Sequence, residues 1–123
     1  MLNQDSMKHL RLILGIILLQ FTTVCYAQNC TTLTQGFTSY AQAVNLVENY
    51  SFKISESVNT SSSSWVQSAH YYSCDGKLGY FILYAQGRSY IHQNVPIDLW
   101  YQFKNANSFG SFYDENIKGR YRL

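Results

Sequence analysis

The stretch that decides the fold runs from Trp65 to Tyr84 and reads WVQSAHYYSCDGKLGYFILY. Aromatic and β-branched residues fill both of its halves, residues 65–72 and residues 77–84, as they do in strands. Asp75 and Gly76 lie between the halves, and this pair favours the tight turn that joins two antiparallel strands. The stretch therefore predicts a β-hairpin.

The chain after the hairpin predicts one more strand and two helices. Residues 86–88 turn the chain into a third short strand, residues 89–92. Pro96 suits the first turn of a helix, and apolar residues follow it at helical spacing. Ser108 can cap a second short helix, which Gly119 ends.

The chain before the hairpin predicts a helix followed by a strand. Apolar residues from Phe37 to Val47 recur at helical spacing, and Thr34 can cap the start of this helix. Residues 50–55 alternate between apolar and polar side chains, which is the pattern of a half-buried strand. Residues 60–64 are a Ser-rich connector. Together these patterns predict an α+β fold, in which a small three- to four-stranded antiparallel sheet packs against two or three short helices.

The N-terminal residues have the order of a secretory signal. Lys8 and Arg11 precede an apolar run over residues 12–19, and Ala27 is a suitable small residue at a cleavage site. We expect cleavage near Ala27 and a secreted or periplasmic protein. The apolar run is shorter than the roughly 20 residues that span a bilayer, so we expect no stable membrane anchor. A retained anchor and a lipid on Cys25 are the alternatives.

Loss of this leader changes the charge and the cysteine count. The nine basic and seven acidic residues of the 123-residue chain become seven and six, a net charge of +1, which is not the basic excess typical of nucleic-acid binding. Cys30 and Cys74 remain as an even pair in an oxidising compartment, so we expect a disulfide between them. Closing that loop would stabilise the fold by about 4 kcal/mol. The alternative is two separate thiols.

Residues 63–121 also carry a family resemblance. The chain shares the following residues with the family pattern: Ser63, Ser64, Val66, Ala69, Tyr71, Leu78, Gly87, Tyr90, Ile91, Val95, Pro96, Trp100, Ala106, Ser108, Gly110, Phe112, Tyr113, Ile117 and Tyr121. This region resembles the KTSC domain, a module named after the C-terminus of some lysyl-tRNA synthetases. His92 replaces the second Tyr of the family's Tyr-x-Tyr core, and Asp114 lies where Asn is common.

The resemblance implies a three-stranded antiparallel sheet followed by helices, and RNA binding has been suggested for the family. We therefore expect three parts in the chain: a signal peptide over residues 1–27, an N-terminal helix and strand extension over residues 28–62, and a KTSC-like domain over residues 63–123. A chain of this length has room for one domain only.

The sequence lacks the patterns of known catalytic and metal sites. His70 and His92 are the only histidines after the leader, and neither belongs to a zinc-binding motif. No serine lies in a Gly-x-Ser-x-Gly elbow. Asp114 and Glu115 are adjacent, so on a helix they point about 100° apart, which is a poor geometry for a paired acid and base. We expect no enzymatic activity, no metal and no cofactor.

Aromatic and basic residues near the C-terminus are the candidates for ligand binding. Tyr90 and His92 share one face of a strand, and a basic cluster follows the last helix. The candidate ligand-binding residues are Tyr90, His92, Trp100, Tyr101, Lys118, Arg120 and Tyr121. A structural hydrogen bond for His92 and a solvated cationic tail are the alternatives.

We therefore expect a small, exported, non-enzymatic binding module of the KTSC type, which is a monomer and binds an unknown protein or a small anionic ligand. The first alternative is a module that binds RNA or single-stranded DNA, for which the near-neutral charge is unfavourable. The second alternative is a small secreted hydrolase or an enzyme inhibitor.

Overall fold

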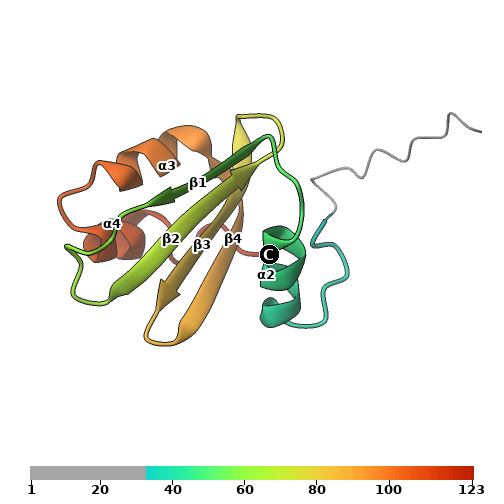
Figure 1. Cartoon of the computed structure of the whole chain (residues 1–123), viewed down its shortest axis with the longest axis horizontal. Helices are drawn as coiled ribbons and strands as arrows, with labels where there is room; N and C mark the ends of the chain where they lie inside the picture. Colours follow the sequence, from blue (N-terminus) through green and yellow to red (C-terminus); the bar gives the residue numbers. More distant parts are fainter. Residues whose placement is uncertain (1–32) are drawn as a thin grey trace, which may run out of the picture.

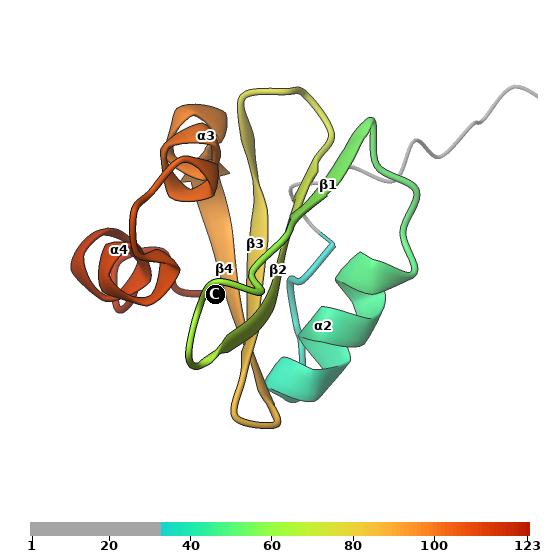
Figure 2. The same ribbon diagram turned by 60° about the vertical axis from the view of Figure 1, so that its left-hand side comes forward.

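The computed structural model describes residues 33–123, which form a four-stranded antiparallel sheet with helices on both faces (Figure 1). The elements, in chain order, are α2 (Tyr40–Glu48), β1 (Ile54–Val58), β2 (Val66–Ser73), β3 (Leu78–Ala85), β4 (Arg88–Pro96), α3 (Ile97–Lys104) and α4 (Phe109–Asn116). The strands lie in the order β1-β2-β3-β4, and each is antiparallel to the one before it. Figure 2 shows α3 and α4 on one face of the sheet and α2 on the other. The predicted α+β fold is confirmed.

Strand β3 is the centre of the molecule because both of its faces are buried. Phe81 and Leu83 pack toward α3 and α4, whereas Tyr80 and Ile82 pack toward α2. A strand that is covered on both faces has a nearly continuous apolar sequence, which explains the apolar composition of the β3 segment LGYFILYA. The fold therefore has two hydrophobic cores with one strand between them.

Half of the buried residues in the core under α3 and α4 are aromatic. Trp100 and Phe103 of α3 are fully buried, and each such side chain contributes roughly 2–3 kcal/mol by burial. The Phe81 and Phe103 rings meet edge to face with 5.0 Å between their centroids. The Tyr71 and Trp100 rings stack with 5.5 Å between theirs. These contacts fix α3 against the centre of the sheet.

One side chain crosses the sheet from β2 to β4. The Tyr71 hydroxyl donates a hydrogen bond of 2.7 Å to the carbonyl oxygen of Val95, two strands away. Its ring passes over Gly79 of β3, where an added Cβ would lie 2.7 Å from Tyr71 Cζ and 2.3 Å from the carbonyl oxygen of Tyr72. The register of β3 and β4 shifts between Gly79 and Phe81, and Asn94 has a φ of 55° there. This bulge places Val95 within the same core as Phe81.

Both predicted turns of the central sheet are present. Asp75 Oδ1 accepts hydrogen bonds from the backbone N–H groups of Lys77 and Leu78, at 2.8 and 3.1 Å. These bonds lower the pKa of the Asp75 carboxyl group. Gln86 and Gly87, with φ of 53° and 74°, form the two-residue turn between β3 and β4. The predicted hairpin is confirmed.

The N-terminal helix differs from its prediction at its start. It begins at Tyr40, and the cap is the Ser39 hydroxyl, which accepts from the Gln42 N–H at 3.1 Å. Thr34 is not the cap: it lies in an earlier turn, buried near the Tyr80 hydroxyl. The buried face is Ala43, Val44 and Val47, and the aromatic ring of Tyr40 is outside it, 60% exposed.

The first strand begins four residues later than predicted. Phe52 lies before the strand and packs on the α2 side, whereas Ile54 packs with the core under α3 and α4. The alternation of residues 50–55 therefore does not describe one strand face, because only residues 54–58 pair with β2. The last strand is longer than predicted and continues to Pro96, since the bulge lets it resume pairing.

The predicted leader, its cleavage near Ala27 and Cys30 lie outside the described residues. The predicted disulfide to Cys74, which follows β2, therefore stays a prediction. Among the described helices, none has the length and apolar character needed to cross a membrane.

Replacing Gly79 by Ala tests the crossing of Tyr71 over β3. Because the new methyl group would overlap the carbonyl of Tyr72 and the ring of Tyr71, the Gly79→Ala variant should lose about 1–3 kcal/mol of unfolding free energy in urea denaturation. Ser57→Ala, at an exposed position of β1, is the control and should change it by less than about 0.5 kcal/mol. Equal stability of both variants would contradict this account of Gly79.

Candidate functional site

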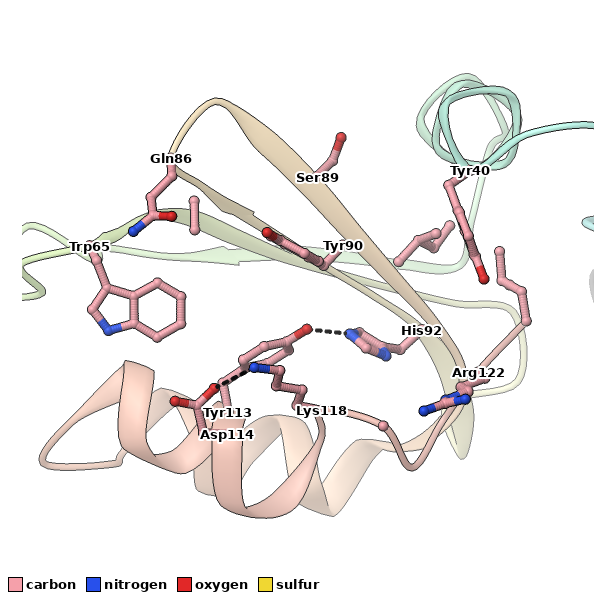
Figure 3. A pocket seen from close by; sticks show the side chains of 14 residues that line it. Tyr40, Trp65, Gln86, Ser89, Tyr90, His92, Tyr113, Asp114, Lys118 and Arg122 are labelled. Carbon is pink, nitrogen blue, oxygen red and sulfur yellow. Dashed lines mark hydrogen bonds and ion pairs between the residues drawn. The ribbon is translucent and has the colours of Figure 1, made fainter.

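A groove of about 820 Å³ runs beside β4 and is the candidate site. In Figure 3, Tyr90 and His92 of β4 form one wall, and Tyr113, Asp114 and Lys118 lie opposite. Trp65 lies at one end, and Tyr40 and Arg122 lie at the other (Figure 3). The lining residues are Tyr40, Trp65, Ala85, Gln86, Ser89, Tyr90, Ile91, His92, Tyr113, Asp114, Lys118, Gly119, Arg122 and Leu123.

The sheet register directs two aromatic side chains of β4 into this groove. Tyr90 pairs with Leu83 and His92 pairs with Phe81, and both partners face the core under α3 and α4. Paired residues of neighbouring strands share a face, so Tyr90 and His92 point toward α4. The predicted sharing of one face is confirmed. Tyr90 is 38% exposed, whereas His92 is only 7% exposed.

Trp65 reaches the groove because α4 has a glycine opposite it. A Cβ at Gly110 would lie 2.2 Å from Trp65 Nε1 and 2.5 Å from Cε2. The indole therefore lies directly against the helix backbone, and its ring meets the Tyr113 ring edge to face, with 6.4 Å between the centroids. This close contact sets the distance between α4 and the start of β2.

His92 and Tyr113 form a polar pair in the wall of the groove. His92 Nε2 and the Tyr113 hydroxyl share a hydrogen bond of 2.8 Å (Figure 3). Burial lowers the pKa of His92 to about 4, and an interaction with the Tyr121 backbone opposes only part of that effect. Burial also raises the pKa of Tyr113 to about 12, with smaller contributions from Tyr90 and Asp114. Both side chains are therefore neutral at pH 7.

The second ring nitrogen of His92 is not satisfied. Within the described part of the chain, Nδ1 is buried and has no hydrogen-bond partner of acceptable geometry. A hydrogen-bonding interaction with the Tyr121 backbone raises the pKa of His92 against the larger effect of burial, so that backbone is the polar group that serves the ring. An unsatisfied buried nitrogen costs about 1–3 kcal/mol, and this interaction offsets part of that cost.

The charged side chains of the groove have a positive excess. Lys118 and Arg122 are the two cations, and Asp114 is the one acidic residue in the lining. Lys118 Nζ lies 3.9 Å from Asp114 Oδ1, and both side chains are more than half exposed, so this ion pair contributes little. An anionic group would therefore be attracted to the positions of Lys118 and Arg122, rather than to the groove as a whole.

The C-terminal tail pairs with β4 and forms one end of the groove. The Gln93 N–H donates to the Tyr121 carbonyl oxygen at 3.2 Å, and Gln93 Nε2 donates to the Arg122 carbonyl oxygen at 3.0 Å. These bonds hold the backbone of Arg122 beside the strand. The tail thereby places the Arg122 side chain at the end of the groove that is opposite Trp65 (Figure 3).

Three of the seven predicted ligand-binding residues line the groove: Tyr90, His92 and Lys118. Trp100 does not, because it is fully buried under α3, and its inclusion is corrected. Tyr101 is exposed on the far side of α3, where Lys104 Nζ lies 4.7 Å from its ring centroid. Arg120 is exposed but outside the lining, and Tyr121 packs against the core.

The sequence patterns do not predict the lining residues other than Tyr90, His92 and Lys118. Trp65 lies in the predicted first strand of the hairpin, and Tyr40 lies within the predicted helical pattern from Phe37 to Val47. Neither pattern marks these residues, or Tyr113 and Arg122, as ligand-binding. The one signal that links Trp65 to α4 is Gly110, because a helical glycine often marks a close approach of another group.

The described residues offer no metal site, since no three His, Cys, Asp or Glu side chains in residues 33–123 are placed to hold an ion.

The depressed pKa of His92 makes stability depend on pH. Unfolded His92 takes up a proton near pH 6.5, whereas the folded protein resists protonation until about pH 4. The neutral His92 therefore makes its full contribution to the free energy of unfolding above pH 6.5, and this contribution of about 3 kcal/mol is lost as the pH falls toward 4. In urea denaturation, the free energy of unfolding of the wild type should therefore fall by about 3 kcal/mol more than that of the His92→Gln variant between pH 6.5 and pH 4.

The matched control for this experiment is His70→Gln, which changes the other histidine of the described chain. It should keep the pH dependence of the wild type. A difference between wild type and His92→Gln that stays constant from pH 7 to pH 4 would contradict the buried, neutral state of His92.

One of the comparisons with known proteins agrees with the resemblance. The family model described as the KTSC domain matches residues 62–121. Neither the curated proteins nor the solved structures contain a match to the chain. The matched range contains β2, β3, β4, α3 and α4, and with them most of the groove, while α2 and β1 precede it. The chain therefore contains a KTSC domain, which spans residues 62–121.

Proposed function

We propose that this protein is an exported binding module without catalytic activity, which holds its ligand in the groove beside β4. The observation that supports this most is the groove itself, because its volume of about 820 Å³ lies within the usual range of ligand sites. Its walls combine aromatic rings with a few polar groups, as such sites do.

The lining suggests the chemistry of the ligand. Trp65 and Tyr90 offer aromatic surfaces for an apolar or aromatic group. Lys118 and Arg122 offer positive charge for an anionic group, and Asp114 opposes only part of it. We therefore propose a ligand that has an apolar part and an anionic part.

The state of His92 supports a role in binding rather than catalysis. A general acid or base works best when its pKa lies near the working pH. A histidine with a pKa of about 4 that is hydrogen-bonded to a tyrosine with a pKa of about 12 is poorly matched to proton transfer at pH 7. As a neutral pair, the two side chains are better suited to positioning a ligand.

The proposal of export rests on the N-terminal pattern of basic residues, apolar run and small residue at Ala27. It includes a disulfide between Cys30 and Cys74, which an oxidising compartment would favour. That bond would tie the start of the mature chain to the turn after β2.

Export predicts a defined mature protein. When the full chain is produced in a bacterial host with an outer membrane, the exported fraction should begin at Gln28 by N-terminal sequencing. Its intact mass should rise by about 2 Da on reduction, because a disulfide gains two hydrogens. Protein that begins at Met1 and remains in the cytosol with both thiols reduced would contradict the proposal.

Binding in the groove predicts a response from one of two tryptophans. Trp65 lines the groove and Trp100 is sealed in the core, so anionic aromatic probes should shift only the Trp65 indole N–H signal in NMR titrations. Benzoate, phenylacetate and hippurate are the probes, and uncharged benzamide is the control. A Trp100→Phe variant assigns the two signals. No shift with any probe, or equal shifts of both indoles, would contradict binding at this site.

A further inference from the structure

The outer edge of β4 is open beside the groove. The strand is the last in the sheet order, so one of its sides has no strand partner among the described residues. The two-residue turn at Gln86 and Gly87 makes Ala85 and Arg88 the hydrogen-bonded pair that closes the hairpin. Alternation along an antiparallel ladder then directs the backbone groups of Ser89, Ile91 and Gln93 away from β3.

The tail shows that this edge accepts a partner. Gln93, one of the three outward residues, donates its N–H to the Tyr121 carbonyl oxygen. Ser89 and Ile91, the other two, make no backbone bond on that side to any residue from 33 to 123. Two consecutive outward positions therefore have no backbone partner within the described part of the chain, and both belong to the groove lining.

The groove follows this open edge. Figure 3 shows it along β4, from Trp65 near the turn to Arg122 near the tail. Tyr90 and His92, which alternate with the outward residues, point from the strand toward α4. An extended chain beside β4 would therefore lie along the groove, and it would present every second side chain to the same aromatic wall.

Charge favours one class of extended chain. Lys118 and Arg122 border the groove, and Asp114 is its only acidic lining residue. An acidic side chain on the bound segment would meet these cations, whereas a basic segment would be repelled.

We infer that the groove is a peptide-binding site, in which an extended acidic segment of a partner protein pairs with Ser89 and Ile91 of β4 and places a carboxylate beside Lys118 and Arg122. This inference rests on the proposed binding function and names its ligand class. The added strand supplies affinity through its backbone, and the aromatic wall selects side chains.

The probe for this inference is a phage-displayed library of linear octapeptides, selected on the purified protein. Selected peptides should share an Asp or Glu, and the Lys118→Glu/Arg122→Glu double variant should bind them about tenfold or more weakly. Arg120→Glu is the matched control, because Arg120 lies in the same tail but outside the groove lining. It should change the affinity by less than about twofold.

Backbone methylation separates strand pairing from side-chain contact alone. A selected peptide is synthesised with N-methyl groups on either the odd or the even residues of its central segment. Only one of the two sets of N–H groups faces β4 in an extended pairing, so one series should lose about tenfold or more in affinity and the other should retain it. Circular dichroism of each protein variant checks that it is folded.

Three results would overturn the inference. The first is a library that yields no binder, and the second is equal tolerance of both methylated series. The third is a combination of two findings: Arg120→Glu weakens peptide binding as much as the Lys118→Glu/Arg122→Glu double variant does, and single-stranded RNA displaces the peptide. This combination would indicate a nucleic-acid surface instead. If the aromatic probes shift Trp65 while no peptide binds, the peptide inference fails and the binding function stands; if neither binds, both fail.

Discussion

Burial of β3 on both faces is the constraint on which the rest of the structure depends. Phe81 and Leu83 need cover on one face, and Tyr80 and Ile82 need it on the other. The helices α3 and α4 cover the first face and α2 covers the second (Figure 2). The second core therefore depends on a helix that precedes the KTSC match, and α2 and β1 belong to the same folded body as the matched region.

A sheet that is covered on both faces leaves its edges as the accessible backbone. At β4, the tail pairs with Gln93, and the segment between the turn and the tail remains open. The helix α4, which covers part of the core, also forms the opposite wall of the groove at this edge through Tyr113 and Asp114, and Lys118 follows directly after it. The site is thus built mostly on strands and helices whose positions the core already fixes, which favours a preorganised surface.

Local patterns predicted the parts of the fold that local chemistry controls. Asp75 and Gly76 predicted their turn because the Asp75 carboxylate bonds to the next backbone groups, and Ser108 predicted its cap for a similar reason. The start of the first strand could not be read in this way, because Phe52 and Ile54 alternate in sequence but pack in different cores. The length of β4 depends on a bulge, for which the sequence had no clear signal.

The site was less predictable than the fold because it is assembled from distant segments. Tyr90 and His92 could be placed on one face by strand alternation. Trp100 has the same chemical character as Trp65, and only the packing distinguishes the one sealed in the core from the one that lines the groove. Which aromatic residues face a ligand is set by contacts between elements that are far apart in the chain.

The contact between Gly110 and Trp65 has a consequence for the evolution of this surface. Because no side chain separates the indole from the backbone of α4, the Trp65 ring packs directly against the helix at Gly110. A single methyl group at this position would act as a spacer that pushes the two apart. One substitution at Gly110 would thereby change the shape of this end of the groove, with every residue of the lining unchanged.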